Sequence, residues 1–269
     1  MRVWILGSGT LLPHPLRGSP GYWVEMGEER ILMDCGSGSL RTLARLGRSW
    51  WGVTHVVLTH FHTDHVGDLA PLLFALKHSS RPPRSAPLHL LAPRGLEGHL
   101  KALAEAHGSY VRDPGFPLAL TELRPDSTWE APSGSFVIRS FPTLHTDTAL
   151  AYRVESANGN FGFTGDTGPM EGLGPFLSGC HLIVAECGNP GGSGRGNHLT
   201  PEELAALAKE TRPDLLIVVH VYPPLDPGAV PDLLRQEGYT GWVEAGRDGM
   251  EVRISPGGVH LRPPDDREH

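Results

Sequence analysis

The chain consists of short apolar runs separated by polar segments rich in glycine and proline. Short runs rich in Val, Ile and Leu predict buried strands, whereas apolar residues three and four apart predict helices. The alternation of the two predicts an α/β fold. The expected strands are Val3–Leu6, Tyr22–Met26, Arg30–Asp34, His55–Leu58, Leu88–Leu91, Phe136–Phe141, Ala149–Val154, Asn160–Thr164, His181–Glu186, Leu215–His220, Gly241–Glu244 and Met250–Ile254. The expected helices are Ser39–Leu46, Leu69–His78, Gly95–Ala106 and Pro201–Lys209.

Several helix ends and breaks carry their own signals. Thr200 is the expected cap of the helix that starts with Pro201, and Asp68 is the expected cap of the helix that starts with Leu69. The residues from Leu261 onward are expected to be a frayed tail. Segments rich in proline and glycine are expected to be loops within one domain of residues 1–269, at Ser79–Pro87, Gly188–Asn197 and Tyr222–Val230.

Composition narrows the class of protein. Of 269 residues, 39% are hydrophobic and 20% are charged, which is typical of a globular domain. No apolar run approaches the ~18–20 residues that span a bilayer, and the N-terminal run is too short for a signal peptide, so we expect a cytoplasmic protein without membrane contact. Three cysteines without CxxC spacing argue against a disulfide framework. A net charge of −7 argues against a nucleic-acid partner, although a local basic patch stays open.

The strongest chemical signal is the stretch VVLTHFHTDHVGDL, at residues 56–69. It places His60, His62, Asp64 and His65 directly after a buried strand. Imidazole and carboxylate groups at this density suit Zn²⁺, with Mn²⁺ and Fe²⁺ as alternatives. The competing interpretation is that two of the histidines lie on the surface and the aspartate caps the next helix. It is weak, because it does not explain four such groups at HxHxDH spacing.

HFHTDH resembles the signature of the metallo-β-lactamase superfamily, which implies a four-layer αββα sandwich with a metal site at one edge. The segments SFPTLHT, FGFTGDT and LLIVVH supply the three later ligands of that family in order, as His145, Asp166 and His220. The resemblance implies that two divalent metal ions are bound. The first would be held by His60, His62 and His145, the second by Asp64, His65 and His220, and Asp166 would bridge both. ILMDCGSG resembles the family's early aspartate segment, so Asp34 is expected to orient a ligand or a loop.

GNHLTPEELAAL, at residues 196–207, resembles the ribonuclease Z-like branch of the superfamily. This resemblance implies phosphodiester hydrolysis by a hydroxide held between the metals, with Asp64 and His198 as catalytic residues and His198 assisting the leaving oxygen. Only 21 positions separate His145 from Asp166, which leaves no room for the tRNA-docking insertion of ribonuclease Z. We therefore expect a small or cyclic phosphodiester substrate.

Three alternatives stay open: a lactonase or thioesterase, which would not need His198; a ribonuclease Z-like tRNA 3′-processing enzyme; and a metal-binding scaffold without activity. GSGTLL, at residues 7–12, lacks the last glycine of a dinucleotide loop, so we reject a dinucleotide site. The apolar stretch Ala70–Leu76 is expected to be either core or the contact face of a homodimer.

Overall fold

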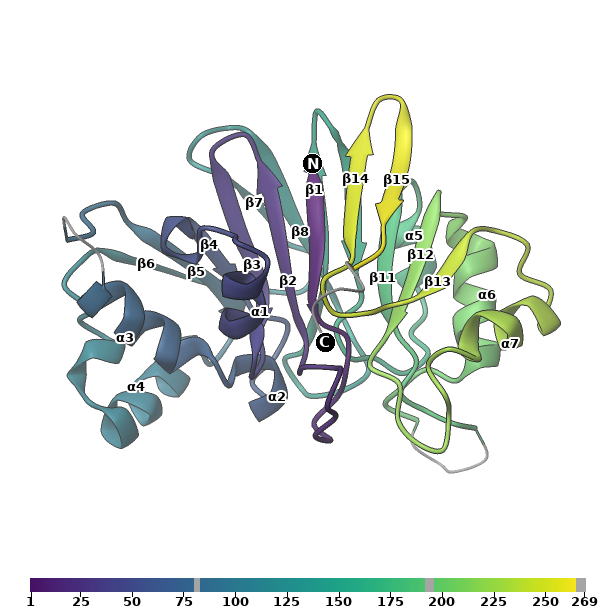
Figure 1. The fold of residues 1–269 in the computed structure, drawn as a ribbon, viewed down its shortest axis with the longest axis horizontal. Helices are drawn as coiled ribbons and strands as arrows, with labels where there is room; N and C mark the ends of the chain where they lie inside the picture. The colour runs from purple at the N-terminus through teal and green to yellow at the C-terminus, as the bar shows by residue number, and fades with distance from the viewer. Residues whose placement is uncertain (80–82, 192–195, 265–269) are drawn as a thin grey trace.

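The computed structural model describes residues 1–79, 83–191 and 196–264, and it consists of two β-sheets with helices on their outer faces (Figure 1). The first sheet contains β1 (Arg2–Gly7), β2 (Gly21–Met26), β3 (Glu29–Cys35), β4 (His55–Val57), β5 (Leu88–Pro93), β6 (Leu118–Leu123), β14 (Glu251–Ser255) and β15 (Gly258–Arg262). The second contains β7 (Thr128–Glu130), β8 (Phe136–Pro142), β9 (Leu150–Ser156), β10 (Gly159–Phe163), β11 (Leu182–Glu186), β12 (Leu215–Val219) and β13 (Val243–Ala245). The strand orders are β15-β14-β1-β2-β3-β4-β5-β6 and β13-β12-β11-β10-β9-β8-β7.

The helices lie on the two outer faces, which confirms the predicted αββα sandwich (Figure 1). They are α1 (Ser39–Arg45), α2 (Thr63–Val66), α3 (Leu69–Ser79), α4 (Leu96–His107), α5 (Leu173–Leu177), α6 (Pro201–Thr211) and α7 (Val230–Gln236), with single 3₁₀ turns at Trp50–Gly52 and Ser109–Val111. No helix of the described ranges is long and apolar enough to cross a membrane. A cytoplasmic location and a homodimer stay predictions.

Three hydrophobic layers hold the sandwich together. Strand β1 shows why, because Val3 and Ile5 belong to the layer between the sheets, while Trp4 and Leu6 belong to the layer under α1, α3 and α4. A strand buried on both faces needs apolar side chains at every position, which is what its sequence provides. The third layer lies between the second sheet and α5, α6 and α7. Most of the stretch at residues 70–76 packs in the second of these layers, although Phe74 is exposed.

The helix caps were predicted with mixed success. Thr200 accepts from the backbone N–H of Glu203, whose side chain accepts from the Thr200 N–H, so the predicted cap of α6 is a complete capping box. The prediction for Asp68 was wrong. Its carboxylate accepts from the N–H groups of Gly38 and Leu40 and therefore caps α1, which packs beside it, instead of its own helix α3.

Six elements of the described residues were not predicted from the sequence: the strands β6, β7 and β15 and the short helices α2, α5 and α7. Strands β6 and β7 are largely half-exposed or exposed edge strands, so apolar runs do not mark them. Helix α7 is short, contains Pro231, and begins at Val230, the last residue of the predicted loop Tyr222–Val230. Strand β15 includes Leu261 and Arg262, which corrects part of the predicted tail. Residues 80–82, 192–195 and 265–269, which include parts of two predicted loops and the end of that tail, lie outside the described residues.

Strand directions bring the candidate ligands to one edge. Strands β10, β11 and β12 are parallel, and β8 runs in the same direction because it pairs with β9, which is antiparallel to β10. In the first sheet β3 and β4 are parallel as well. The carboxyl ends of parallel strands share one edge of a sheet, so loops that follow these strands gather their polar residues there.

Candidate metal centre

The sequence-predicted ligands come together at this edge from four separate segments of the chain. His60 and His62 follow β4, Asp64 and His65 lie on α2, and the other three follow strands of the second sheet. One group of donors within 4.8 Å of one another consists of His60, His62, His145 and Asp166, and a second group consists of Asp64, His65 and His220. The structure therefore brings together all seven side chains that the sequence analysis named, in two adjoining clusters, and their division between two metals stays a prediction.

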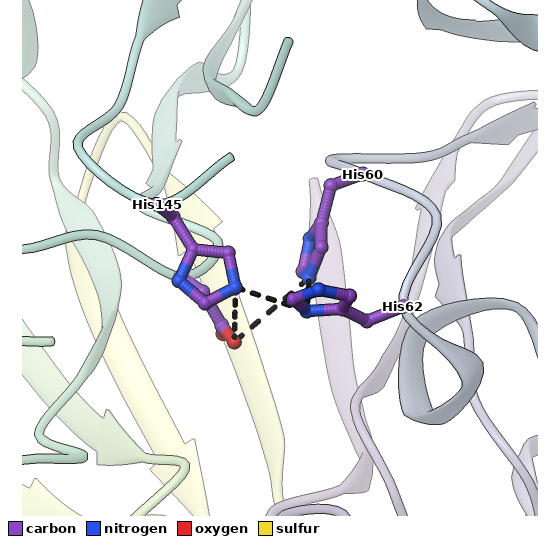
Figure 2. A group of neighbouring side chains, drawn as sticks. His60, His62 and His145 are labelled. Carbon is purple, nitrogen blue, oxygen red and sulfur yellow. Dashed lines mark hydrogen bonds and ion pairs between the residues drawn. The ribbon is translucent and has the colours of Figure 1, made fainter. Parts of the chain in front are cut away.

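Three ring nitrogens of the first cluster face one another (Figure 2). Nδ1 of His62 lies 3.0 Å from Nε2 of His60 and 3.0 Å from Nε2 of His145. The carboxylate of Asp166 lies beside them, with Oδ2 3.6 Å from Nε2 of His145 and 3.9 Å from Nε2 of His60. Four donors thus converge on one point at this edge of the sandwich.

Hydrogen bonds on the far sides of these rings fix which nitrogen carries a proton. Asp34 is fully buried and accepts from the N–H and hydroxyl of Thr59 and, at 2.7 Å, from Nδ1 of His65. Thr59 Oγ1 in turn accepts from Nδ1 of His60 at 3.0 Å, and the carbonyl of Asn197 accepts from Nδ1 of His145 at 3.1 Å. In the neutral rings, the Nε2 atoms therefore present lone pairs to the cluster.

This arrangement fits a bound cation. A proton on Nδ1 of His62 can be shared with only one of its two neighbours, so the remaining lone pairs repel unless a positive charge lies between them. Nε2 of His65 is buried and, within the described residues, has no hydrogen-bond partner, although it lies 3.4 Å from Oδ1 of Asp166. Imidazole nitrogens and carboxylate oxygens in this number suit Zn²⁺, Mn²⁺ or Fe²⁺.

Asp166 is the electrostatic centre of both clusters. Its Oδ2 atom lies 3.5 Å from Nε2 of His220, which is itself 3.3 Å from Oδ2 of Asp64. Burial raises the pKa of Asp166, but His220 and His65 outweigh that effect and hold the pKa well below its usual range. Burial alone would lower the pKa of His65. The carboxylates of Asp166 and Asp34 outweigh burial and raise that pKa well above its usual range. The site thus favours a carboxylate at Asp166, the ionisation state that binds metal.

Two residues of this edge have left-handed backbone conformations, with φ of 49° at Asp34 and 54° at His220. Such values are uncommon for residues with a Cβ atom and cost on the order of 1 kcal/mol. At Asp34 the three hydrogen bonds of the buried carboxylate offset that cost. Asp34 was expected to orient a ligand or a loop, and it contacts the candidate ligand His65.

Glu186 is the residue that the sequence reasoning missed. It ends β11 and is buried, and its carboxylate accepts from Nδ1 of His198 at 2.8 Å and from the N–H groups of Thr167 and Gly188, each at 2.7 Å. One nitrogen of the His198 ring lies within 4.8 Å of donor atoms of Asp166 and His220. A charged residue at the end of the apolar run LIVAE was the available signal, because a buried carboxylate needs such partners.

The candidate ligands lie at a cavity of about 1170 Å³. It is lined by His62, Asp64, His145, Asp166 and His198 together with Thr10–Ser19 and one side of α1. Burial lowers the pKa of His145, so its ring is neutral and able to bind a metal near neutral pH. A pocket of this volume accepts a ligand of nucleotide size. The cavity therefore provides a place for a substrate directly beside the candidate ligands.

Comparison with known proteins places this geometry in a family context. The model of the β-lactamase superfamily domain matches residues 29–221. Ribonuclease Z of Mycobacterium bovis (strain BCG / Pasteur 1173P2) is 27% identical, over 95% of this chain and 99% of that protein. Among solved structures, the metallo-β-lactamase fold protein YhfI of Bacillus subtilis has a TM-score of 0.80 at 21% identity, covering 97% and 99% of the two chains. The short form of human tRNase Z has a TM-score of 0.76 at 21% identity, covering 94% and 99%.

Proposed function

The chain belongs to the metallo-β-lactamase superfamily and is a metal-dependent hydrolase, and within that class we propose a dinuclear phosphodiesterase for a small or cyclic phosphodiester. The observation that carries the proposal is the buried pair of Glu186 and His198 beside the metal cluster. A hydrolase of lactones or thioesters needs the metal ligands but not an additional imidazole such as that of His198, which Glu186 orients.

We assign one metal to His60, His62 and His145, the second to Asp64, His65 and His220, and Asp166 to both. The division of the donors into two adjoining groups and the contacts of Asp166 with members of each support this assignment. Zinc is the expected metal, with manganese and iron as alternatives. Bound there, two divalent ions supply a water of lowered pKa and polarise a phosphoryl oxygen.

The protein's own contribution is to position a proton. Because Nδ1 of His198 donates to Glu186, the opposite nitrogen, Nε2, is left to hold a proton for the leaving oxygen or to stabilise charge on the phosphoryl group. The ring of His198 lies between those of His145 and His220, with centroids 4.9 and 5.6 Å away. This position, next to both groups of candidate ligands, suits a side chain that acts directly on the substrate. We also assign Asp64 to catalysis, through the metal that it would hold.

Two features favour a small substrate. His145 and Asp166 are 21 positions apart, and the residues between them form the hairpin of β9 and β10 with its flanking turns. In ribonuclease Z this is the place of the tRNA-docking insertion. The chain also carries a net charge of −7, which opposes binding of a long polyanion. RNA processing is the second candidate, because the curated relatives are named ribonuclease Z.

The test compares the purified enzyme with His198→Ala on bis(p-nitrophenyl) phosphate, cyclic nucleotides, lactones, thioesters and a precursor tRNA, with metal content measured on each sample. We expect phosphodiester turnover to fall about 100-fold or more in the variant while two metals are retained. His107→Ala, an exposed histidine outside the cavity, is the matched control.

Each alternative has its own result. Equal turnover of bis(p-nitrophenyl) phosphate by the variant, with hydrolysis of lactones or thioesters, would show the competing enzyme class. Cleavage of precursor tRNA with far higher efficiency than of any small diester would show the RNA enzyme. Two bound metals without hydrolysis of any probe would support the metal-binding scaffold without activity.

A further inference from the structure

One wall of the cavity is formed by α1, which carries Arg41 and Arg45. We propose that these two arginines form a subsite for a second anionic group, a phosphomonoester, carried by the same substrate whose phosphodiester is hydrolysed at the metals. This inference rests on the proposed function and adds a substrate class to it: diesters that bear an additional phosphate.

The two guanidinium groups are placed to act together. Residues four apart on a helix lie on the same face, and both of these arginines are exposed and line the cavity. Among the described residues neither guanidinium has a hydrogen-bond or ion-pair partner. Each group offers five N–H donors in a planar fork that matches phosphate oxygens, so the pair brings unused donors to the cavity.

The third arginine of the cavity wall shows the contrast. Arg17 donates to Oγ of Ser8 at 3.1 Å and to the carbonyl of Gly246 at 2.6 Å, so it holds the base of the loop at residues 10–17. Asp248, the cavity carboxylate outside the metal cluster, accepts from the N–H and hydroxyl of Ser8 and from the N–H of Gly18. The carboxylate oxygens of Asp248 are therefore hydrogen-bonded to the two ends of the loop and do not bind Arg41 or Arg45.

The N-terminus of α1 does not supply the anion site. The N–H groups of Gly38 and Leu40 already donate to the carboxylate of Asp68, and that of Ser39 donates to the carbonyl of Gly36. The positive charge that α1 brings to the cavity is therefore on its side chains. In a chain with a net charge of −7, an unpaired cationic pair beside a phosphodiester site selects for extra negative charge on the ligand.

The experiment uses two matched chromogenic probes with the same scissile bond. Thymidine 5′-(p-nitrophenyl phosphate) carries only the diester, and its 3′-phosphorylated form adds a phosphomonoester. In both, water adds to phosphorus and p-nitrophenolate leaves. We expect the wild-type enzyme to prefer the 3′-phosphorylated probe at least tenfold in kcat/KM, and the preference to shrink as ionic strength rises.

In the double variant Arg41→Ala/Arg45→Ala the preference should disappear. In Arg41→Lys/Arg45→Lys it should persist in part, because the charge stays but the planar fork is lost. The control Arg94→Ala/Lys101→Ala removes two exposed cations outside the cavity and should keep the wild-type preference. Melting temperatures of all variants identify any loss of folding.

Two outcomes would overturn the subsite alone: turnover of both probes by the wild type without preference, or a preference that the alanine variant retains. Failure of the wild type to hydrolyse either probe would instead overturn the proposed phosphodiesterase, and the subsite with it.

Discussion

Replacing Glu186 by glutamine probes the catalytic geometry with minimal change of shape. One carboxylate oxygen accepts from the N–H of Thr167 and from Nδ1 of His198, and the other accepts from the N–H of Gly188. If the amide oxygen of the glutamine takes the first position, its NH₂ group faces the Gly188 N–H, donor against donor. The flipped amide creates the same conflict with Thr167 and His198.

The size of the effect follows from these contacts. An ionised acceptor makes a hydrogen bond about twice as strong as a neutral one, so the bond to a protonated His198 weakens by about 1–1.5 kcal/mol. At about 1.4 kcal/mol per factor of ten, kcat/KM should fall roughly tenfold. The unsatisfied buried N–H should lower the free energy of unfolding by about 1–3 kcal/mol.

The assay is the pH profile of kcat/KM on bis(p-nitrophenyl) phosphate, with metal content and urea unfolding measured on the same preparations. Loss of the carboxylate makes a proton on His198 harder to hold, so the alkaline limb should move to lower pH. Glu237→Gln, at an exposed position outside the cavity, is the matched control. A variant with unchanged rate and pH profile but lowered stability would refute the positioning role, and metal loss in proportion to activity would assign the effect to the metals.

Other predictions concern stability and metal binding. Burial lowers the pKa of His55 from 6.5 to about 4. As pH falls, the unfolded chain therefore binds a proton at this histidine before the folded chain does, and about 3 kcal/mol of unfolding free energy should be lost between pH 6.5 and 4. Urea unfolding of His55→Leu should show a flatter pH dependence in that window, and an unchanged slope would contradict this. Asp34→Ala should weaken metal affinity about 10–100-fold by releasing His65, measured by competition with a chelator; wild-type affinity would count against it. Thr200→Ala should lower the free energy of unfolding, measured in urea, by about 1 kcal/mol, because the capping box is lost. An unchanged free energy of unfolding would show that the capping box does not stabilise the protein.

Contacts between distant residues explain where sequence reasoning stopped at the site. It predicted that Asp34 orients a ligand or a loop, but only the packing of α2 against β3 brings His65 to the Asp34 carboxylate. It also paired Asp68 with its own helix, whereas the carboxylate lies closer to the N-terminus of α1. Hydrogen-bond partners 28 to 31 positions apart leave no local periodic signal.

What the sequence by itself determined is the set of polar residues at strand ends and the apolar strands that precede them. Those features are local: a buried strand needs a continuous apolar run, and a ligand such as His60 or His220 must stand where the run stops. The tertiary structure decided what parallel strands bring side by side. The contact of Glu186 with His198 depends on how the segment after β11 folds back onto the end of that strand. The contacts of Asp166 with His65 and His220 arise between loops of different sheets, which meet only after the two sheets pack. The same packing places Arg41 and Arg45 in the cavity wall, where they have no partner among the described residues.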